Sequence, residues 1–240
     1  NLPDATVIPS ENFNTVLYTA ATSNGTYQIT GNGFKPDFSW IKNRDNAEGH
    51  YLFDVIRGNT NMTDKFLQSN LTAAEGAGSV AGTTITVNDD GMQVVETSIG
   101  SGELYFNGRT YVMWNWKAGG TASSNSNGSI TSSASYTGTG ANATVGHGLS
   151  SAPEMMIIKS RSDGAVDWGV YHTALGPTKW VRLNLTSASA TASNVWNDTA
   201  PTSSVFSLGS GGHLNGSNDT EIAYCFHSVD GYSKVGSYTG

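Results

Sequence analysis

The chain has 240 residues, of which 37 % are hydrophobic and only 13 % are charged, against roughly 25 % charged in ordinary globular domains. Its formal net charge is −7 and its twelve Lys and Arg residues form no cluster, which argues against a nucleic-acid partner. No apolar run approaches the ~18 residues of a membrane-spanning helix, and the N-terminal residues lack the charged-then-apolar order of a signal peptide.

The first half of the chain predicts a series of short strands. Residues 1–12 are polar, with two prolines, and are expected to form an extended lead-in or linker. Beyond them the polar share is carried by Ser, Thr, Asn and many of the 29 glycines, a composition that favours strands and turns over long helices. Apolar runs between Gly, Asn and Asp turn residues predict strands over Phe13–Ala20, Tyr27–Thr30, Asp37–Lys42, Tyr51–Gly58, Lys65–Thr72, Thr83–Val87, Met92–Glu96, Glu103–Phe106 and Thr110–Lys117.

The second half repeats the order of the first after a polar interruption. Residues 118–133 (AGGTASSNSNGSITSS) are rich in Gly, Ser and Asn and predict a linker or a long exposed loop. The strand that ends in IKNR at Arg44 has a counterpart that ends in IKSR at Arg161, and TYVMWNWK is matched by TEIAYCFH. The remaining strands predicted in this half are Val170–Gly176, Trp180–Thr186, Ser204–Ser210 and Thr220–His227. This self-similarity predicts a tandem duplication.

The predicted fold class is all-β, with two tandem antiparallel β-sandwich repeats over residues 13–117 and 134–240. One pseudo-symmetric sandwich built from both halves is the alternative. Within each repeat, large residues at matching positions are expected to pack in the core, with Trp40, Trp114 and Trp116 matched by Ile157, Tyr224 and Phe226.

A family resemblance rests on the order of these motifs. GFKPDFSWIKNR, LFDVIRG, TYVMWNWKAGG and SYTGTG follow one another along the chain. In this order they resemble a repeated domain of marine bacteriophage tail-fibre-like virion proteins, often described as concanavalin A-like or lectin-like sandwiches. The resemblance covers nearly the whole chain from about Phe13. It implies a jelly-roll or concanavalin A-like fold and a place on a virion surface, and it supplies no catalytic or ligand-binding residues.

The search for catalytic and metal-binding patterns favours a protein that is not an enzyme. There is no Gly-x-Ser-x-Gly nucleophile motif, and no pair of acidic residues is distinguished by its context as glycosidase carboxylates would be. The five His residues are scattered without zinc spacing. Cys225 is the sole cysteine, which excludes an internal disulfide and predicts a buried, inert thiol.

Three tryptophans in the second half are the candidate ligand contacts. Trp168, Trp180 and Trp196 lie near polar loops, and Trp196 is followed by Asn197 and Asp198. An exposed indole beside Asn and Asp stacks on a sugar ring while its neighbours bind hydroxyl groups. Contact with another subunit and local packing remain the two alternatives.

Lys42 and Arg44, with their counterparts Lys159 and Arg161, are the charges that recur most faithfully. One interpretation is contact with an anion or an acidic sugar. The interpretation that we favour is structural, with the side chains extending over the edge of the core and pairing with loop acids.

Calcium is the metal that two loops would accommodate, through the Asp and Asn oxygens of residues 88–91 and 215–219. Ordinary Asx turns are the favoured alternative for both loops. No other cofactor is expected.

Taken together, these patterns predict a non-enzymatic phage fibre or adhesion module at the virion surface. Its expected partners are other virion proteins, further copies of itself, and a host-surface glycan or protein, with avidity from a homo-oligomer. The alternatives are a purely structural virion component, either a capsid decoration or a fibre shaft, and a secreted carbohydrate-binding module.

Overall fold

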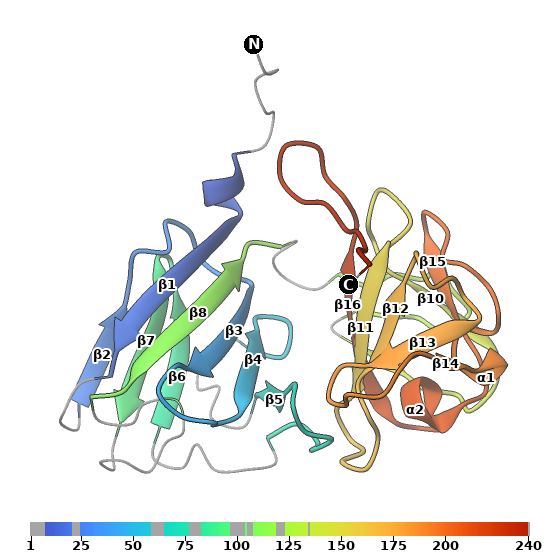
Figure 1. Ribbon diagram of the computed structural model, residues 1–240, viewed down its shortest axis with the longest axis horizontal. Coiled ribbons are helices and arrows are strands. Elements are labelled where there is room, and N and C mark those ends of the chain that lie inside the picture. The colour runs from blue at the N-terminus through green and yellow to red at the C-terminus, as the bar shows by residue number, and fades with distance from the viewer. Residues whose placement is uncertain are drawn as a thin grey trace. The chain divides into compact units, whose positions relative to one another are not determined.

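Strands account for nearly all of the regular structure in the part of the chain that is described. The computed structural model describes residues 8–20, 25–58, 65–76, 83–96, 104, 108–118, 123–133 and 135–239. The chain divides into two compact units, Ile8–Ala122 and Ser123–Gly240. Figure 1 shows each unit as a set of strands joined by loops. The all-β prediction is confirmed, and the strands form four antiparallel sheets. The predicted strand over residues 103–106 lies outside the described residues apart from Leu104.

The first unit contains a five-stranded and a three-stranded sheet. The larger sheet has the order β1-β8-β3-β4-β5, and the smaller has the order β2-β7-β6. A single 3-10 turn, η1 (Pro9–Glu11), precedes the first strand. The strands are β1 (Phe13–Thr19), β2 (Gly25–Ile29), β3 (Phe38–Asn43), β4 (His50–Asp54), β5 (Leu67–Gln68), β6 (Thr83–Asn88), β7 (Gly91–Glu96) and β8 (Thr110–Trp116).

The core of this unit lies between its two sheets. Ile41, Phe53 and Met113 come from the larger sheet, and Ile85 and Val94 come from the smaller one, yet all five belong to one cluster of buried side chains. Because side chains of both sheets pack into one core, the unit is a two-layer sandwich.

The second unit contains a six-stranded and a two-stranded sheet. The larger sheet has the order β14-β13-β12-β11-β16-β9, and the smaller pairs β10 with β15. Two single-turn helices that the sequence patterns did not predict, α1 and α2, also contribute to its core. The elements are β9 (Tyr136–Thr137), β10 (Ala143–Gly146), β11 (Met155–Ser160), β12 (Gly169–His172), β13 (Lys179–Arg182), β14 (Ala190–Thr191), α1 (Ser193–Trp196), β15 (Val205–Leu208), α2 (Gly212–Asn215) and β16 (Thr220–Phe226).

The second unit begins earlier than residue 134, inside the stretch predicted as a linker. The Asn125 amide donates to the Ser132 carbonyl at 2.7 Å, and the Ser132 amide donates to the Asn125 carbonyl at 2.9 Å. The Ile130 amide donates to the Thr144 carbonyl at 2.9 Å, and its side chain belongs to the core cluster of this unit. Ile130, together with hydrogen bonds of Ser129 to Thr144 and of Ser132 to Gly146, holds the second half of that run against the sandwich.

The larger sheets of the two units have corresponding strands in corresponding register. The order β1-β8-β3-β4-β5 matches β9-β16-β11-β12-β13. In the first unit Phe38 pairs with Trp116 and Trp40 with Trp114. At the matching places of the second unit Met155 pairs with Phe226 and Ile157 with Tyr224. The positions matched by sequence are therefore matched in space within each sheet.

Candidate functional site

Strand β8 carries its two tryptophans on the sheet face that turns away from the core. Tyr111, Met113 and Asn115 are each 0 % exposed, whereas Trp114 and Trp116 are only partly buried. Successive side chains of a strand point to opposite faces of its sheet. Trp40 pairs directly with Trp114 and so shares its face. The expectation that Trp40, Trp114 and Trp116 form the core is therefore wrong, because the strand alternation assigns the core to their neighbours.

These three indoles and one imidazole line a surface depression of about 360 Å³, formed by Trp40, His50, Trp114 and Trp116. The Trp40 ring stands nearly perpendicular to the Trp114 ring, at 85° and 6.5 Å between centroids. It also meets the His50 ring edge to face, at 76° and 5.9 Å. Edge-to-face packing fixes aromatic side chains at defined angles, so the walls of the depression are held in place before any ligand arrives.

His50 is fixed to Trp40 by a hydrogen bond that also sets its tautomer. The Trp40 Nε1–H donates to His50 Nδ1 at 3.0 Å, so the ring proton of neutral His50 is assigned to Nε2. Burial, and then the positive charge of Lys42, lowers the pKa of His50 below its ordinary value. The imidazole is therefore neutral at pH 7 and keeps Nε2–H as a donor.

Apolar side chains extend the depression toward the edge strand β1. The Trp116 ring lies 5.0 Å from the ring of Phe13 and 5.1 Å from that of Phe38. Further along β1, Leu17 is 61 % exposed and pairs with Val112 of β8. β1 is an edge strand of the larger sheet. The aromatic face is therefore open along this edge.

The predicted ligand contacts Trp168, Trp180 and Trp196 are buried. They are 0 %, 3 % and 1 % exposed, respectively. Trp180 and Trp196 belong to the core cluster of the second unit, and Trp196 packs edge to face against Tyr171 at 5.7 Å. A ring that stacks on a ligand must present a face to solvent, and none of the three does. The local-packing alternative therefore describes them, because α1 turns Trp196 inward despite its polar neighbours in the sequence.

Asn197 and Asp198 are exposed, but the tryptophan beside them in sequence, Trp196, is buried. Both have left-handed backbone conformations, with φ of 52° and 47°, and Asn197 is the C-terminal cap of α1. Asn and Asp adopt this conformation more readily than other non-glycine residues, so their position is explained by the turn that they form.

The recurring lysines bind loop carbonyls. Lys42 Nζ donates to the carbonyls of Asn43 and Asn46, each at 2.9 Å, and Lys159 Nζ makes the same two contacts one unit later, to Ser160 at 2.7 Å and Asp163 at 2.9 Å. Each ammonium group thereby holds the loop that follows its strand. Burial lowers the pKa of Lys159, with nearby acidic groups opposing the shift.

The two arginines of these pairs differ. Arg44 is exposed, whereas Arg161 donates to the Ser135 hydroxyl at 3.3 Å. The four charges predicted as an anion contact therefore form no single site within either unit, and the structural interpretation describes the two lysines.

In the two loops considered for calcium, Asp90 and Asn215 use their side-chain oxygens for hydrogen bonds to backbone amides of other segments. The Asp90 carboxylate accepts from the amides of Gly31 at 3.0 Å and Gly33 at 2.5 Å, and these bonds lower the pKa of Asp90. Asn215 accepts from the Thr139 amide at 2.8 Å. Among the residues that the structure describes, no group of three His, Cys, Asp or Glu side chains is placed to hold a metal ion.

The interior of the second unit contains a buried carboxyl group. Glu221 of β16 is 0 % exposed and pairs with Tyr136 of β9 and Ser160 of β11. Burial, reinforced by Asp219 and opposed by Lys159, raises the pKa of Glu221 to about 8, so the group is mostly protonated at neutral pH. Burial also raises the pKa of the Cys225 thiol, to about 12, which leaves it protonated and unreactive.

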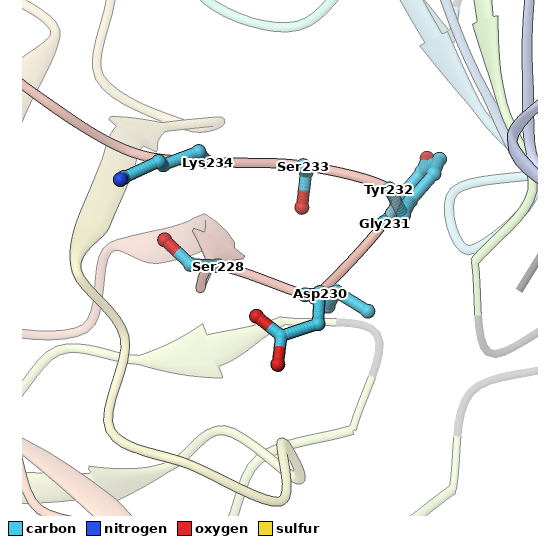
Figure 2. A pocket seen from close by; sticks show the side chains of 7 residues that line it. Ser228, Asp230, Gly231, Tyr232, Ser233 and Lys234 are labelled. Atoms are coloured by element: carbon cyan, nitrogen blue, oxygen red, sulfur yellow. The ribbon is translucent and has the colours of Figure 1, made fainter. Parts of the chain in front are cut away.

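A second depression lies within one loop near the C-terminus. Figure 2 shows that its labelled side chains all belong to the segment Ser228–Lys234. The loop is anchored where Glu154 accepts hydrogen bonds from the amide and hydroxyl of Ser228, at 2.6 and 2.5 Å. Because every lining residue comes from one short segment, we interpret the depression as the hollow of a turn.

The signal for the aromatic site was present in the sequence as alternation. Trp114 and Trp116 stand at alternate positions of one strand, and Asn115 and Met113 stand between them. A strand covered on both faces would give the same pattern, so spacing alone did not separate the buried face from the exposed one. The repeat comparison then favoured the core, because all three tryptophans were matched by large apolar residues.

Comparison with known proteins gives one family. No described helix is long and apolar enough to cross a membrane. Neither a search of curated proteins nor a search of solved structures finds a match. A family model described as a domain of unknown function (DUF7483) matches residues 8–240 and so spans both units. The chain therefore belongs to the DUF7483 family.

Proposed function

We propose that this chain is a non-enzymatic adhesion module of a bacteriophage fibre, and that it binds a host-surface glycan or protein through the depression of Trp40, His50, Trp114 and Trp116. The observation that carries the proposal is this accessible aromatic cluster on a rigid sheet face. Aromatic side chains are enriched where proteins bind ligands and partners. The resemblance of the sequence motifs to virion proteins supports the location at the virion surface.

The two units are, in this proposal, diverged copies of one sandwich unit of the jelly-roll or concanavalin A-like kind. A common origin is supported by the strand pairing, because Phe38 pairs with Trp116 at the same register as Met155 pairs with Phe226. The equivalent carbonyl contacts of Lys42 and Lys159 also support it. Among the described residues, the aromatic depression is formed by residues of the first copy. In a homo-oligomer the same site is presented several times, and this repetition provides avidity.

A glycan array, combined with binding to intact marine bacterial cells, tests the adhesion function. The wild-type chain is compared with Trp114→Ala and with Tyr224→Ala, the matched substitution in the second unit. We expect Trp114→Ala to lose binding and Tyr224→Ala to retain it. Equal binding by all three proteins would contradict the proposal.

The second candidate function is a structural virion component whose aromatic face contacts a neighbouring subunit. It is favoured by the exposed Leu17, which extends the apolar face along β1. Sedimentation velocity of the same proteins separates the candidates. Association that Trp114→Ala abolishes, without glycan or cell binding by the wild type, would support the structural role.

A further inference from the structure

We propose that a second copy of this chain pairs with the open edge of strand β1, so that the two larger sheets join into one antiparallel sheet about a twofold axis at Leu17. The proposal concerns the backbone edge of β1 rather than the aromatic depression. It goes beyond the proposed function, and it holds whether or not the depression binds a host ligand. It follows from the length of β1, its outward backbone groups and its lack of charge.

The edge formed by β1 differs from the other edges of the two larger sheets. Their other edge strands, β5, β9 and β14, are two residues long, whereas β1 has seven. Proteins prevent edge strands from pairing with another chain by keeping them short, or by placing Lys or Pro in them. The sequence of β1, FNTVLYT, contains no charged residue and no Pro, and its Leu17 is 61 % exposed. The protection given to the other three edges is therefore missing from β1.

The backbone of β1 directs the groups of alternate residues away from its sheet. In an antiparallel pair, the positions that exchange hydrogen bonds with the neighbour alternate along each strand. The Asn12 carbonyl accepts from the Lys117 amide at 2.8 Å. At the other end, the Ala20 amide donates to the Arg109 carbonyl at 2.9 Å. Even-numbered positions of β1 therefore bond to β8, and odd-numbered positions direct their N–H and C=O groups toward the open edge.

Three exposed odd-numbered residues, Thr15, Leu17 and Thr19, define this edge. The Thr15 amide already donates to Oδ1 of Asn14 at 2.8 Å. Apart from this bond, none of their outward groups is hydrogen-bonded to a described residue. A partner strand thus meets the Thr15 carbonyl, both backbone groups of Leu17 and the Thr19 amide, and each of these needs a hydrogen-bonding partner when water is excluded.

These groups are complementary to themselves, which is why we assign the partner as a second copy. When two β1 strands run antiparallel with Leu17 opposite Leu17, each Leu17 amide donates to the other Leu17 carbonyl. In the same register each Thr19 amide donates to the Thr15 carbonyl of the other copy, and the Asn14 contact is kept. The two Leu17 side chains lie opposite each other, where apolar cross-strand pairs are stabilising. No like charges meet, because β1 has none.

This arrangement is a closed twofold dimer, the commonest form of homo-oligomer. Its axis is perpendicular to the joined sheet, so the aromatic depressions of both copies open on the same face. A pair of seven-residue strands buries less than the roughly 1,200–2,000 Å² of stable interfaces. We therefore expect a weak dimer, with a Kd of about 10–100 μM.

Sedimentation velocity of the whole chain between about 1 and 300 μM tests the pairing, and we expect a shift from monomer to dimer over this range. Thr19→Pro removes one outward amide and leaves the bonds to β8 in place, since an edge strand accepts proline where the N–H faces solvent. It should weaken association at least about tenfold. Thr137→Pro is the matched control, because Thr137 pairs with Thr220 as Thr19 pairs with Thr110. It should associate like the wild type.

Two substitutions of Leu17 test the register. Leu17→Lys places two ammonium groups opposite each other at the axis and should abolish association. Leu17→Cys should be crosslinked to its copy by a short bismaleimide, whereas Thr137→Cys should not. The native Cys225 does not interfere, because burial raises the pKa of its thiol to about 12. Far-ultraviolet circular dichroism confirms that each variant is folded.

The outcomes are distinct from those of the adhesion test. A chain that stays monomeric at about 300 μM, or association that neither Thr19→Pro nor Leu17→Lys weakens, would overturn the edge pairing. Association that Trp114→Ala abolishes would assign the contact to the aromatic face and would also overturn it. None of these results decides whether the depression binds a host ligand, which depends on adhesion of the same Trp114→Ala variant to cells.

Discussion

The larger sheets of the two units have the same strand order, but the tryptophans of the two units differ in exposure. In the first unit Trp40 and Trp114 face away from the core beside His50. In the second unit Trp180 and Trp196 face the core, and the position that matches His50 is Trp168, which is fully buried. The same strand order thus supports either a packing role or a surface role for large aromatic residues. The difference teaches that the segments that pack against a sheet face, rather than the residue type, decide whether an aromatic side chain is exposed.

The cores differ because the second layers differ. A three-stranded sheet covers the larger sheet of the first unit, whereas β10 and β15 alone form the second sheet of the other. Val195 and Trp196 of α1 and Leu214 of α2 complete that smaller layer. Bulky side chains therefore fill space in the second unit that β6 helps to fill in the first, since protein interiors tolerate few voids.

The largest expected difference between the units is the stability cost of removing a tryptophan. Trp196→Ala should cost about 3–5 kcal/mol because it opens a cavity in the core. Trp114→Ala removes a partly exposed side chain and should cost about 1 kcal/mol. Urea denaturation followed by circular dichroism measures both, with a separate transition fitted for each unit. A similar loss of unfolding free energy in the two variants would contradict the assignment of Trp196 to the core and of Trp114 to the surface.

The next difference concerns the matched lysines. Lys159→Met should destabilise the second unit by about 2 kcal/mol, because two loop carbonyls lose their donor at a site where the side chain is fully buried. Lys42→Met breaks the same two contacts where water can replace the ammonium group, so its cost should stay below about 1 kcal/mol. Differential scanning calorimetry of the two variants gives the ranking. The reverse order would show that burial is not the deciding factor.

Glu221 should make the stability of the second unit fall as pH rises. The pKa of Glu221 is about 8 in the folded chain, above the ordinary value of about 4.3, so folding favours the protonated carboxyl. Its contribution is fully present below the unfolded pKa and is lost as pH rises through about 8. Glu221→Gln should flatten this decline and raise stability at pH 8 by about 1–2 kcal/mol.

Melting temperatures between pH 5 and 9 test this prediction, with Glu154→Gln as the control. Glu154 has a lowered pKa because of its hydrogen bonds to Ser228. Removing its charge should therefore not remove the decline at high pH. If stability declines with rising pH in Glu221→Gln as it does in the wild type, a titrating group other than Glu221 causes the decline.

The smallest expected effect is the pH dependence of ligand binding at the aromatic site. Protonated His50 carries a proton on Nδ1 and cannot accept the Trp40 hydrogen bond. Because the pKa of His50 is lowered, binding should be constant near neutral pH. It should weaken about 2- to 10-fold only well below about 6.5. Adhesion to intact cells, measured as a function of pH, checks this, and His50→Gln should adhere independently of pH. Weakening that persists in His50→Gln would contradict the assignment.

The sequence by itself determined most of the strands and their correspondence, but it did not predict α1 and α2. Alternating apolar residues predict most of the strands, with β3 near its predicted limits of Asp37–Lys42. The repeat comparison pairs positions such as Trp40 and Ile157, which occupy matching registers. Both signals are local or depend only on order along the chain, so no knowledge of the packing was needed.

The tertiary structure alone decided which aromatic residues are exposed. Alternation divides the residues of a strand between two faces, but the layer that covers one face comes from segments distant in sequence. In the first unit β6 and β7 belong to the layer that covers the larger sheet, and in the second unit α1 and α2 do. For that reason Trp196, which has polar neighbours in sequence, is buried, whereas Trp114, in an apolar run, lines a surface site.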